Sequence, residues 1–482
     1  MGSLKKEFFH GVLYTGIAKY SSIFIGIFIS AILARLLTPS DFGIVAIATV
    51  FINFFSTLTT VGISPAIVQD KSINHSDLRS INTFSFLLAF VVTILYLLLV
   101  PIILIFYEES ESLKNIMYLL AINVFFSIAS VVPNALLLKA KMFKFIALRT
   151  FLINVSLGII SVISAYCGFG VYALLLSPIC GSIIFLFVNF YKQPIGFCSI
   201  RKESLSKILS YSLFQMMFNL MYLAYRNIDK LFLGKYFGLS SLGYYEKSYR
   251  LMMLPLENVS SIMSPVLHPI LSNMQDDKES IWYAYKKMIS IISEFSFSIS
   301  IMLFFFASTL VNLLFGSQWS DSIPIFEILT FSISVQLLQA PLGGVLQSIN
   351  KVNVLFYGSV IEFIFVLVGV IVGVFFKNLN VFAWGIVIAF ILGFIVYQAY
   401  IAKCFNKNIR EIFSILIPYF VHSILLLAIC FPFRNLISNS YIQVIVFCFV
   451  FFIYELISIK IGMMPNTKKI LYKIINKIKY DN

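Results

Sequence analysis

Apolar runs of roughly 20 residues recur from one end of this sequence to the other, and they restrict its fold more than any other feature. A run of that length lets an α-helix cross the hydrocarbon core of a bilayer. Helices and closed β-barrels are the structures that satisfy every backbone polar group in lipid. The sequence therefore predicts an all-α polytopic membrane protein with about fourteen transmembrane helices. Their approximate limits are 9–36, 42–67, 81–106, 115–138, 146–167, 171–191, 207–234, 249–272, 287–315, 323–347, 353–376, 381–402, 411–432 and 440–460.

Lysine and arginine are distributed unevenly between the loops that join these spans. Most of the 35 cations fall on one side when the N-terminus is taken as cytoplasmic, and the acidic residues Glu108, Glu109 and Glu111 fall on the other. Because cytoplasmic loops carry an excess of Lys and Arg, we expect both termini to be cytoplasmic. The net charge of +14 does not indicate a nucleic-acid partner, since the cations lie in short loops and form no separate basic domain.

The two halves of the chain resemble each other. Residues 40–43 (SDFG) recur 200 positions later as residues 240–243 (SSLG), and Pro133 corresponds to Pro341. Six spans in each copy would send both copies through the membrane in the same direction, so we expect two parallel six-helix lobes. The expected domains are a first lobe at 1–200, a second lobe at 201–405, two further spans at 406–462 and a basic cytoplasmic tail at 463–482.

The motifs of familiar enzyme classes are missing from the sequence. It contains no GxxxxGK[ST] nucleotide-binding loop, no HExxH zinc helix and no nucleophile elbow. The six cysteines and four histidines are scattered without disulfide or metal-ligand spacing. These absences weaken the enzyme hypotheses, and we expect no resident cofactor or metal. Without a nucleotide-binding loop, any driving force would be an ion gradient, with H⁺ or Na⁺ as the candidate ions, or the downstream consumption of product.

One predicted span carries charged residues at membrane depth. Arg226, Asp229 and Lys230 lie in an otherwise apolar stretch. Each such charge costs about 2.5–3.5 kcal/mol on insertion scales, so it usually faces a bundle interior or a water-filled cavity. Five polar residues at steps of four, three, four and four would share one face of a continuous helix. These residues are Gln215, Asn219, Tyr222, Arg226 and Lys230.

A matching polar face lies 200 residues earlier, at Thr15, Lys19, Ser22, Gly26 and Ser30. Small polar residues of this kind also serve as contacts between membrane helices, and for Thr, Ser and Gly we favour that interpretation. For the cations we favour a wet, positively charged cavity that attracts a phosphate or pyrophosphate. The predicted substrate-binding residues are Lys19, Arg226, Asp229, Lys230, Arg250, Asn219 and Gln215. An alternative role for Asp229 is an internal ion pair that orients the cations.

Several acidic residues in the second half of the chain are candidates for other roles. We assign ion coupling to Glu257 and Glu362, and Glu294 is a weaker candidate for the same role. We expect His422 and Glu455, which lie in the last two spans, to be packing or lipid-interface residues.

Five segments resemble the signatures of one family. Residues 33–43 (LARLLTPSDFG) and 62–69 (GISPAIVQ) resemble the first-loop signature of the polysaccharide transporter family, within the multidrug/oligosaccharidyl-lipid/polysaccharide exporter superfamily. Residues 226–234 (RNIDKLFLG), 242–245 (LGYY) and 249–252 (YRLM) resemble the second-lobe signature of its Wzx-type flippases, particularly those for O-antigen, capsule or colanic-acid-like units. The resemblance covers almost the whole chain.

This resemblance implies a function. Wzx-type flippases move undecaprenyl-pyrophosphate-linked oligosaccharides to the outer leaflet of the bacterial cytoplasmic membrane, by alternating access around a cationic cavity. Arg226, Asp229 and Arg250 occupy signature positions, Lys19 is assigned from its polar face, and Lys230 departs from the family pattern, in which this position is often uncharged. The implied partners are the lipid-linked oligosaccharide, membrane lipids, a polysaccharide polymerase and a chain-length regulator, but no nucleic acid.

Other functions stay open at this point. An O-antigen polymerase or ligase is a polytopic membrane enzyme that uses the same lipid donor, but it typically carries a large outer loop that this sequence lacks. A cation-coupled multidrug antiporter of the same superfamily normally has twelve spans and an acidic cavity. A lipid II flippase shares the fourteen spans and the cationic cavity, and only the local motifs favour the polysaccharide branch.

Overall fold

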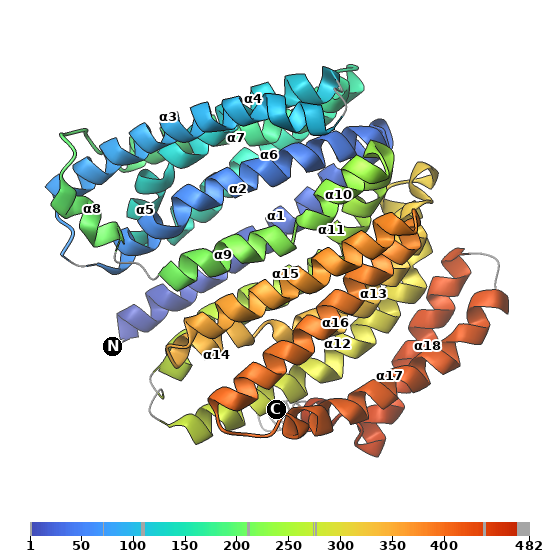
Figure 1. Ribbon diagram of the computed structural model, residues 1–482. Helices are drawn as coiled ribbons and strands as arrows, with labels where there is room; N and C mark the ends of the chain where they lie inside the picture. The colour runs from blue at the N-terminus through green and yellow to red at the C-terminus, as the bar shows by residue number, and fades with distance from the viewer. Residues whose placement is uncertain are drawn as a thin grey trace. The chain divides into compact units, whose positions relative to one another are not determined.

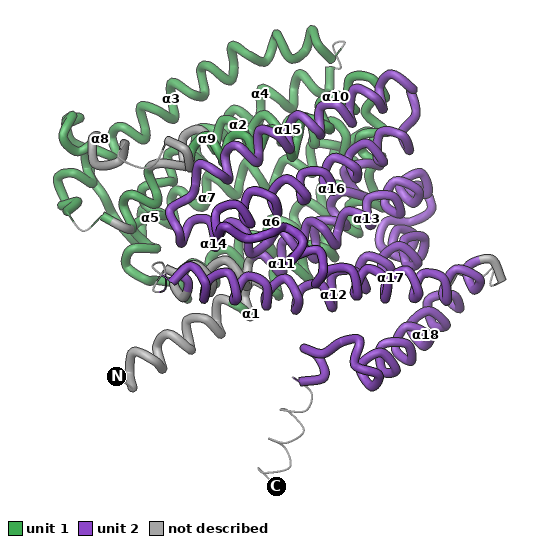
Figure 2. The backbone as a smooth tube through the Cα atoms, turned by 60° about the horizontal axis from the view of Figure 1, so that its bottom comes forward, with its two compact units in different colours: residues 1–243 green, residues 244–482 purple. Residues whose placement is uncertain are grey.

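The computed structural model describes residues 2–70, 72–107, 111–209, 213–272, 274, 277–436 and 440–469 (Figure 1). Regular structure within these ranges is entirely helical. The chain forms two compact units, residues 1–243 and residues 244–482, which are called the first unit and the second unit below (Figure 2).

The first unit contains ten α-helices, a 3₁₀ turn and the first residues of an eleventh α-helix. They are α1 (Gly2–Leu36), α2 (Pro39–Gln69), α3 (His75–Phe106), α4 (Glu111–Ala129), α5 (Val131–Lys139), α6 (Phe143–Tyr166), η1 (Gly170–Leu175), α7 (Leu176–Lys192), α8 (Lys202–Leu209), α9 (Leu213–Tyr225), α10 (Ile228–Tyr236) and the start of α11 (Leu239–Ser272).

The second unit contains the rest of α11 and the helices that follow it. These are α12 (Lys278–Leu314), η2 (Ser317–Trp319), α13 (Ser322–Gln339), α14 (Leu342–Ser348), α15 (Val352–Phe375), α16 (Leu379–Cys404), α17 (Arg410–Leu436) and α18 (Ser440–Ile461). Helices α17 and α18, coloured red in Figure 1, pack against each other and against α12.

Eleven segments of the described chain are long and apolar enough to cross a membrane, and they identify a multi-pass membrane protein. They match eleven of the predicted spans. The other three predicted spans have identifiable differences. The apolar part of α1 is the shorter segment Tyr20–Leu36, the span predicted at 207–234 is divided between two helices, and α11 carries four charged residues.

The start of α2 shows why the signature sequence TPSD begins a helix. Thr38 is the N-cap residue, and its hydroxyl accepts a hydrogen bond from the Asp41 backbone N–H at 3.3 Å. In return, the Asp41 carboxylate accepts the Thr38 backbone N–H at 2.9 Å. Pro39 occupies the first turn, where its missing N–H costs nothing. This reciprocal pair is a capping box, so the motif fixes the point at which α2 starts.

Helix breaks recur at corresponding places in the predicted repeat. The fourth predicted span is divided at Ser130 into α4 and α5, and the tenth is divided at Ala340–Pro341 into α13 and α14. The short second helix of each pair ends shortly before a non-glycine residue in the left-handed region, Lys141 or Asn350, both with φ 55°. Positive φ is uncommon outside glycine. A shared break and a shared left-handed turn therefore support the internal repeat.

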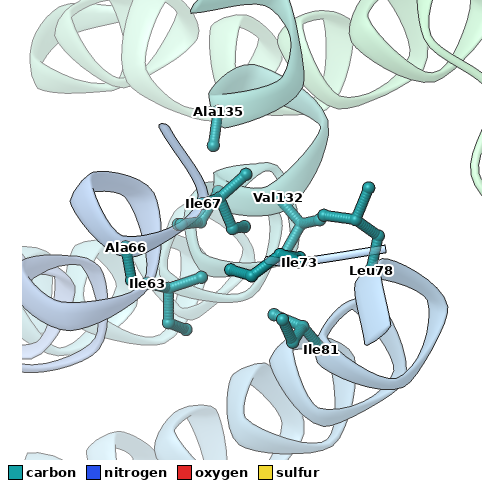
Figure 3. Packing of buried hydrophobic residues seen from close by; sticks show 9 residues of the cluster. Ile63, Ala66, Ile67, Ile73, Leu78, Ile81, Val132 and Ala135 are labelled. Atoms are coloured by element: carbon teal, nitrogen blue, oxygen red, sulfur yellow. The ribbon is translucent and has the colours of Figure 1, made fainter. Parts of the chain in front are cut away.

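Interior contacts in the first unit join helices that are distant in sequence. A cluster of buried aliphatic residues packs α2 against the start of α3 and against α5 (Figure 3). The cluster comprises Ile63, Ala66, Ile67, Ile73, Leu78, Ile81, Val131, Val132 and Ala135. In the second unit, α15 and α16 approach closely at Gly369 and Gly385, where a β-carbon on either residue would lie 2.6 Å from the other's carbonyl oxygen. Small residues allow membrane helices this close approach.

The division into compact units does not follow the expected domain limits. Helices α8, α9 and α10 all pack against α2, so they belong to the first unit although they follow residue 200. The compact units divide at residues 243–244, within the first turns of α11. The assignment of 1–200 and 201–405 to two repeated lobes stays a prediction about the internal repeat.

Candidate functional site

The charged segment lies at a break between two helices. Helix α9 ends at Tyr225, Arg226 and Asn227 form a turn, and α10 starts at Ile228. The prediction of one continuous polar face from Gln215 to Lys230 is therefore wrong, because Lys230 belongs to a different helix from the upstream residues.

Asn227 provides a physical reason for this break. Its backbone N–H bonds to the Ala224 carbonyl at 3.2 Å, and its side-chain amide donates to the Leu223 carbonyl at 2.9 Å. The side chain thus takes the carbonyl that an α-helical N–H at this position would use. The Asn227 carbonyl accepts the Leu231 N–H, which begins α10.

Arg226 rests against two aromatic rings of α9. Its guanidinium carbon lies 5.4 Å from the centroid of the Tyr222 ring and 5.5 Å from that of the Tyr225 ring. The two rings meet edge to face at 5.3 Å, and Tyr225 is buried. A guanidinium within about 6 Å of an aromatic centroid is attracted to the ring face. The partly buried Arg226 side chain is therefore positioned at the helix break by its own helix.

Asp229 is the most enclosed of the predicted site residues in the first unit whose side chains the structure describes. It lies in the first turn of α10, with 2% of its surface exposed, and its carboxylate accepts the Lys230 backbone N–H at 2.9 Å. A carboxylate near a helix N-terminus is stabilised by the helix dipole. Asn219 and Lys230 are partly buried. The ion pair predicted between Asp229 and its neighbouring cations stays a prediction.

The side chains of two predicted substrate-binding residues are not described by the structure. Lys19 and Gln215 have side chains that lie outside the described residues, although both positions belong to helices, α1 and α9. Their proposed contacts with substrate stay predictions.

Two other predicted site residues are brought together on α11. The Arg250 guanidinium lies 3.9 Å from the Glu257 carboxylate, and these side chains are 63% and 50% exposed. Both belong to the second unit. An exposed ion pair of this kind adds little stability. The contact thus pairs a predicted substrate residue with a predicted ion-coupling residue.

Glu362 is fully buried in α15, where it packs against Gly393 of α16. A β-carbon at residue 393 would lie 2.9 Å from Glu362 Cγ and 3.0 Å from Oε1. The glycine therefore leaves the space that the carboxyl side chain occupies. Sequence reasoning identified Glu362 but missed Gly393, whose role depends on a neighbouring helix.

The signature segments themselves form a contact that sequence reasoning also missed. Gly43 in α2 lies against the backbone of Leu239, and Gly243 in α11 lies against the backbone of Pro39. A β-carbon on either glycine would overlap the facing carbonyl oxygen. The Tyr107 hydroxyl adds a hydrogen bond of 2.9 Å to the Leu231 carbonyl. The recurrence of glycine at 43 and 243 was the available signal for this reciprocal contact.

Comparison with known proteins places these features in a family. Residues 32–324, which include the signature segments and the α9–α10 break, match the family described as polysaccharide biosynthesis protein. The chain belongs to this polysaccharide biosynthesis protein family. The family prediction made from the signature segments is thereby confirmed.

Relatives of this polysaccharide biosynthesis protein match it over most of their length. A membrane protein in the cps region of Klebsiella pneumoniae, described as uncharacterized, is 26% identical over 470 residues, covering 91% of this chain and 92% of the relative. The lipopolysaccharide biosynthesis protein WzxC of Escherichia coli (strain K12) is 23% identical over 439 residues, covering 87% and 86%.

The fold of this polysaccharide biosynthesis protein is similar to that of a solved transporter. The lipid II flippase MurJ in an inward closed conformation matches with a TM-score of 0.75 and 16% sequence identity, covering 93% of this chain and 99% of that chain. The predicted fold class, an all-α polytopic membrane protein, is confirmed. The roles of individual site residues stay predictions.

Proposed function

We propose that this protein is a flippase that moves lipid-linked oligosaccharide repeat units across the bacterial cytoplasmic membrane for surface polysaccharide synthesis. Family membership and the similarity to WzxC along most of the chain support the substrate class. The observation that carries the proposal is the interrupted helix α9–α10, which holds Arg226 at its break within a membrane protein.

A broken membrane helix suits an anionic substrate. Half-helices that end inside a membrane protein direct backbone N–H groups and a positive dipole end toward anionic groups of the substrate. In this chain the α10 N-terminus follows directly after Arg226. A guanidinium binds phosphate oxygens bidentately. The pyrophosphate linker of a lipid-linked sugar would therefore find the Arg226 cation and the positive end of a helix dipole at one place.

The remaining parts of the proposal follow from the membrane fold. A pyrophosphate and its sugars cannot cross hydrocarbon unaided, because burying unpaired charge is very costly. The lipid tail would stay in the bilayer while the head group passes through the protein. The sequence has no nucleotide-binding loop, so the driving force would be an ion gradient or the consumption of product. Cytoplasmic termini and contact with a polymerase and a chain-length regulator belong to this proposal.

The test is deletion of the gene in its native host, with complementation by wild type, Arg226→Ala or Arg226→Lys. Without the protein, surface polysaccharide should disappear while an intact oligosaccharide-pyrophosphate lipid accumulates facing the cytoplasm. The Arg226→Ala protein, present at normal level, should fail to complement. Arg226→Lys should be intermediate, since lysine keeps the charge and loses the bidentate geometry.

A different outcome would point to another function. If single repeat units still reach the outer leaflet in the deletion strain and only chain length is lost, the protein is a polymerase and the flippase proposal is wrong.

A further inference from the structure

A polar cluster lies where α12, α17 and α18 pack together in the second unit, outside the residues assigned to substrate. It contains two carboxyl groups and an imidazole, from Glu294, Glu455 and His422, and each comes from a membrane-spanning segment. Ionisable groups in such segments are expensive and usually mark ion or proton pathways. The two carboxyl groups differ sharply in their surroundings.

Glu294 is surrounded by hydrogen-bond donors. It is 1% exposed, and its Oε1 atom accepts the backbone N–H of Asn466 at 2.8 Å and the Tyr419 hydroxyl at 3.2 Å. Its Oε2 atom accepts the backbone N–H of Thr467 at 2.9 Å and the Thr467 hydroxyl at 2.6 Å. The Asn466 side-chain amide donates to Oε1 as well, at 2.9 Å. A carboxylate with this many donors has its charge satisfied. Glu294 thereby ties α12 to the segment that follows α18.

Glu455 has far fewer donors. Ser298 donates to Oε1 at 2.7 Å, whereas Oε2 finds no hydrogen-bond donor among the described residues. His422 Nε2 lies 3.7 Å from Oε2, and the Glu455 and His422 side chains are 14% and 3% exposed. The same Nε2 atom lies 3.0 Å from the Ser458 hydroxyl. The prediction that His422 and Glu455 are lipid-interface or packing residues thus omitted their contact with each other.

These surroundings favour a proton shared between Glu455 and His422. With the proton on Glu455, both groups are neutral, and with the proton on His422, they form an ion pair. Without it, an incompletely bonded Glu455 carboxylate would stand in a membrane span, a state that burial penalises. Among the described residues, Tyr454 on α18 also contacts the pair: its ring centroid lies 4.7 Å from that of His422, and its hydroxyl donates to the His422 main-chain carbonyl at 2.8 Å.

We infer that Glu455 and His422 form a proton-binding site between α17 and α18. Its ligand is a proton, exchanged with water rather than supplied by a cofactor. The Ser298 hydroxyl also lies 3.5 Å from the Glu294 main-chain carbonyl on the same helix.

Only the coupling role of this proton rests on the proposed flippase function. The site would bind the proton that couples export to a proton gradient. It would place the coupling group in the two helices outside the repeated lobes, and not at Glu257 or Glu362.

Proton binding can be tested without substrate. The full-length protein, labelled with ¹⁵N-histidine, would be studied by NMR in lipid nanodiscs, and the His422 signals would be assigned with His422→Gln among only four histidines. At a fixed pH, Glu455→Gln should lower the ratio of charged to neutral His422 by about tenfold or more, because an opposite charge at this distance favours the imidazolium. Glu455→Asp should recover part of that ratio.

Glu327→Gln is the matched control, since Glu327 pairs with Arg434 at 2.8 Å and does not belong to the cluster. It should leave the His422 ratio unchanged. An identical ratio in wild type and Glu455→Gln would overturn the inference. If Glu455→Gln does not fold, Glu455→Asp decides instead: its His422 signals must move from the wild-type values, and unchanged signals contradict the shared proton.

Coupling is then measured as the rate at which lipid-linked oligosaccharide reaches the outer leaflet, with and without an ionophore that collapses the pH gradient. The ionophore should slow wild type and have no further effect on the slower Glu455→Gln protein. If wild type moves no lipid, the proposed function fails. If wild type moves lipid and Glu455→Gln is equally fast and equally sensitive to the ionophore, the coupling role of the site fails.

Discussion

Gly43 packs so closely against Leu239 that a β-carbon at residue 43 would overlap the Leu239 carbonyl oxygen and lie 2.8 Å from its carbonyl carbon. Gly243 makes the equivalent contact with Pro39. These four residues are two pairs of repeat-related positions, since Leu239 and Gly243 follow Pro39 and Gly43 by 200 positions. The family signature therefore includes a backbone-to-backbone contact between the starts of α2 and α11, in addition to the polar residues of the second copy.

Replacement of Gly43 by alanine should destabilise this contact. The added methyl group meets backbone, which cannot rotate away, and overpacking of this kind costs typically 1–3 kcal/mol. We expect Gly43→Ala to lower the thermal unfolding temperature of the detergent-solubilised protein and to reduce export. Gly343→Ala is the control, because a β-carbon there meets no atom within 4 Å. Equal unfolding temperatures for the two variants would contradict the contact.

Replacement of Gly393 should also destabilise the protein for a steric reason, but here the obstacle is the Glu362 side chain. Gly393→Ala should cost about 1–3 kcal/mol, because its β-carbon meets Glu362 Cγ and Oε1. Glu362→Ala removes those atoms, so the double variant should be less destabilised than the sum of the two single variants. Thermal unfolding of the four proteins measures this coupling, and strict additivity would show that the two residues do not compete for space.

The aromatic support of Arg226 predicts a graded effect on transport. Tyr225→Leu removes a ring that contributes about 0.5–2 kcal/mol of cation–π attraction, so we expect export to fall about 2- to 30-fold. Tyr225→Phe keeps the ring and should retain most activity. The measurement is the rate of surface polysaccharide production at matched protein levels. A defect as large in Tyr225→Phe as in Tyr225→Leu would assign the effect to the hydroxyl instead.

The Asp277 carboxylate should contribute to the stability of the fold in a pH-dependent way. It caps α12, and hydrogen bonds from the Ser280 hydroxyl and backbone N–H hold the pKa of its carboxyl below the usual value. A lowered folded-state pKa contributes stability above the unfolded pKa, which is lost as the pH falls through the folded pKa.

Asp277→Ala should therefore lower the unfolding temperature at neutral pH, and its difference from wild type should shrink in acid. Asp277→Asn keeps an acceptor without a charge and should remove mainly the pH dependence. Parallel melting curves of wild type and Asp277→Ala at every pH would contradict the role of the ionised cap.

The helical membrane class, most of the spans and the family could all be predicted from the sequence. Each of these depends on composition or on residues close to one another in the chain. The continuous polar face from Gln215 to Lys230 was predicted wrongly, because periodicity alone does not show that the Asn227 side chain takes the Leu223 carbonyl and ends the helix. The pairing of Arg250 with Glu257 was also not anticipated, although both residues lie on one helix.

The sequence by itself determined that the chain crosses the membrane many times, because no other arrangement accommodates repeated apolar runs of that length. The capping box at the start of α2 is likewise local, since Thr38 and Asp41 are only three residues apart. The tertiary structure decided which glycines pack directly against another helix. It also decided which buried carboxyl groups receive hydrogen bonds on both oxygens. Gly43 packs against the backbone of Leu239. Residues 466–467 donate hydrogen bonds to Glu294, whereas Glu455 on α18 lies near His422 on α17. Such contacts join residues far apart in the chain, and no local pattern encodes which partner a side chain will meet.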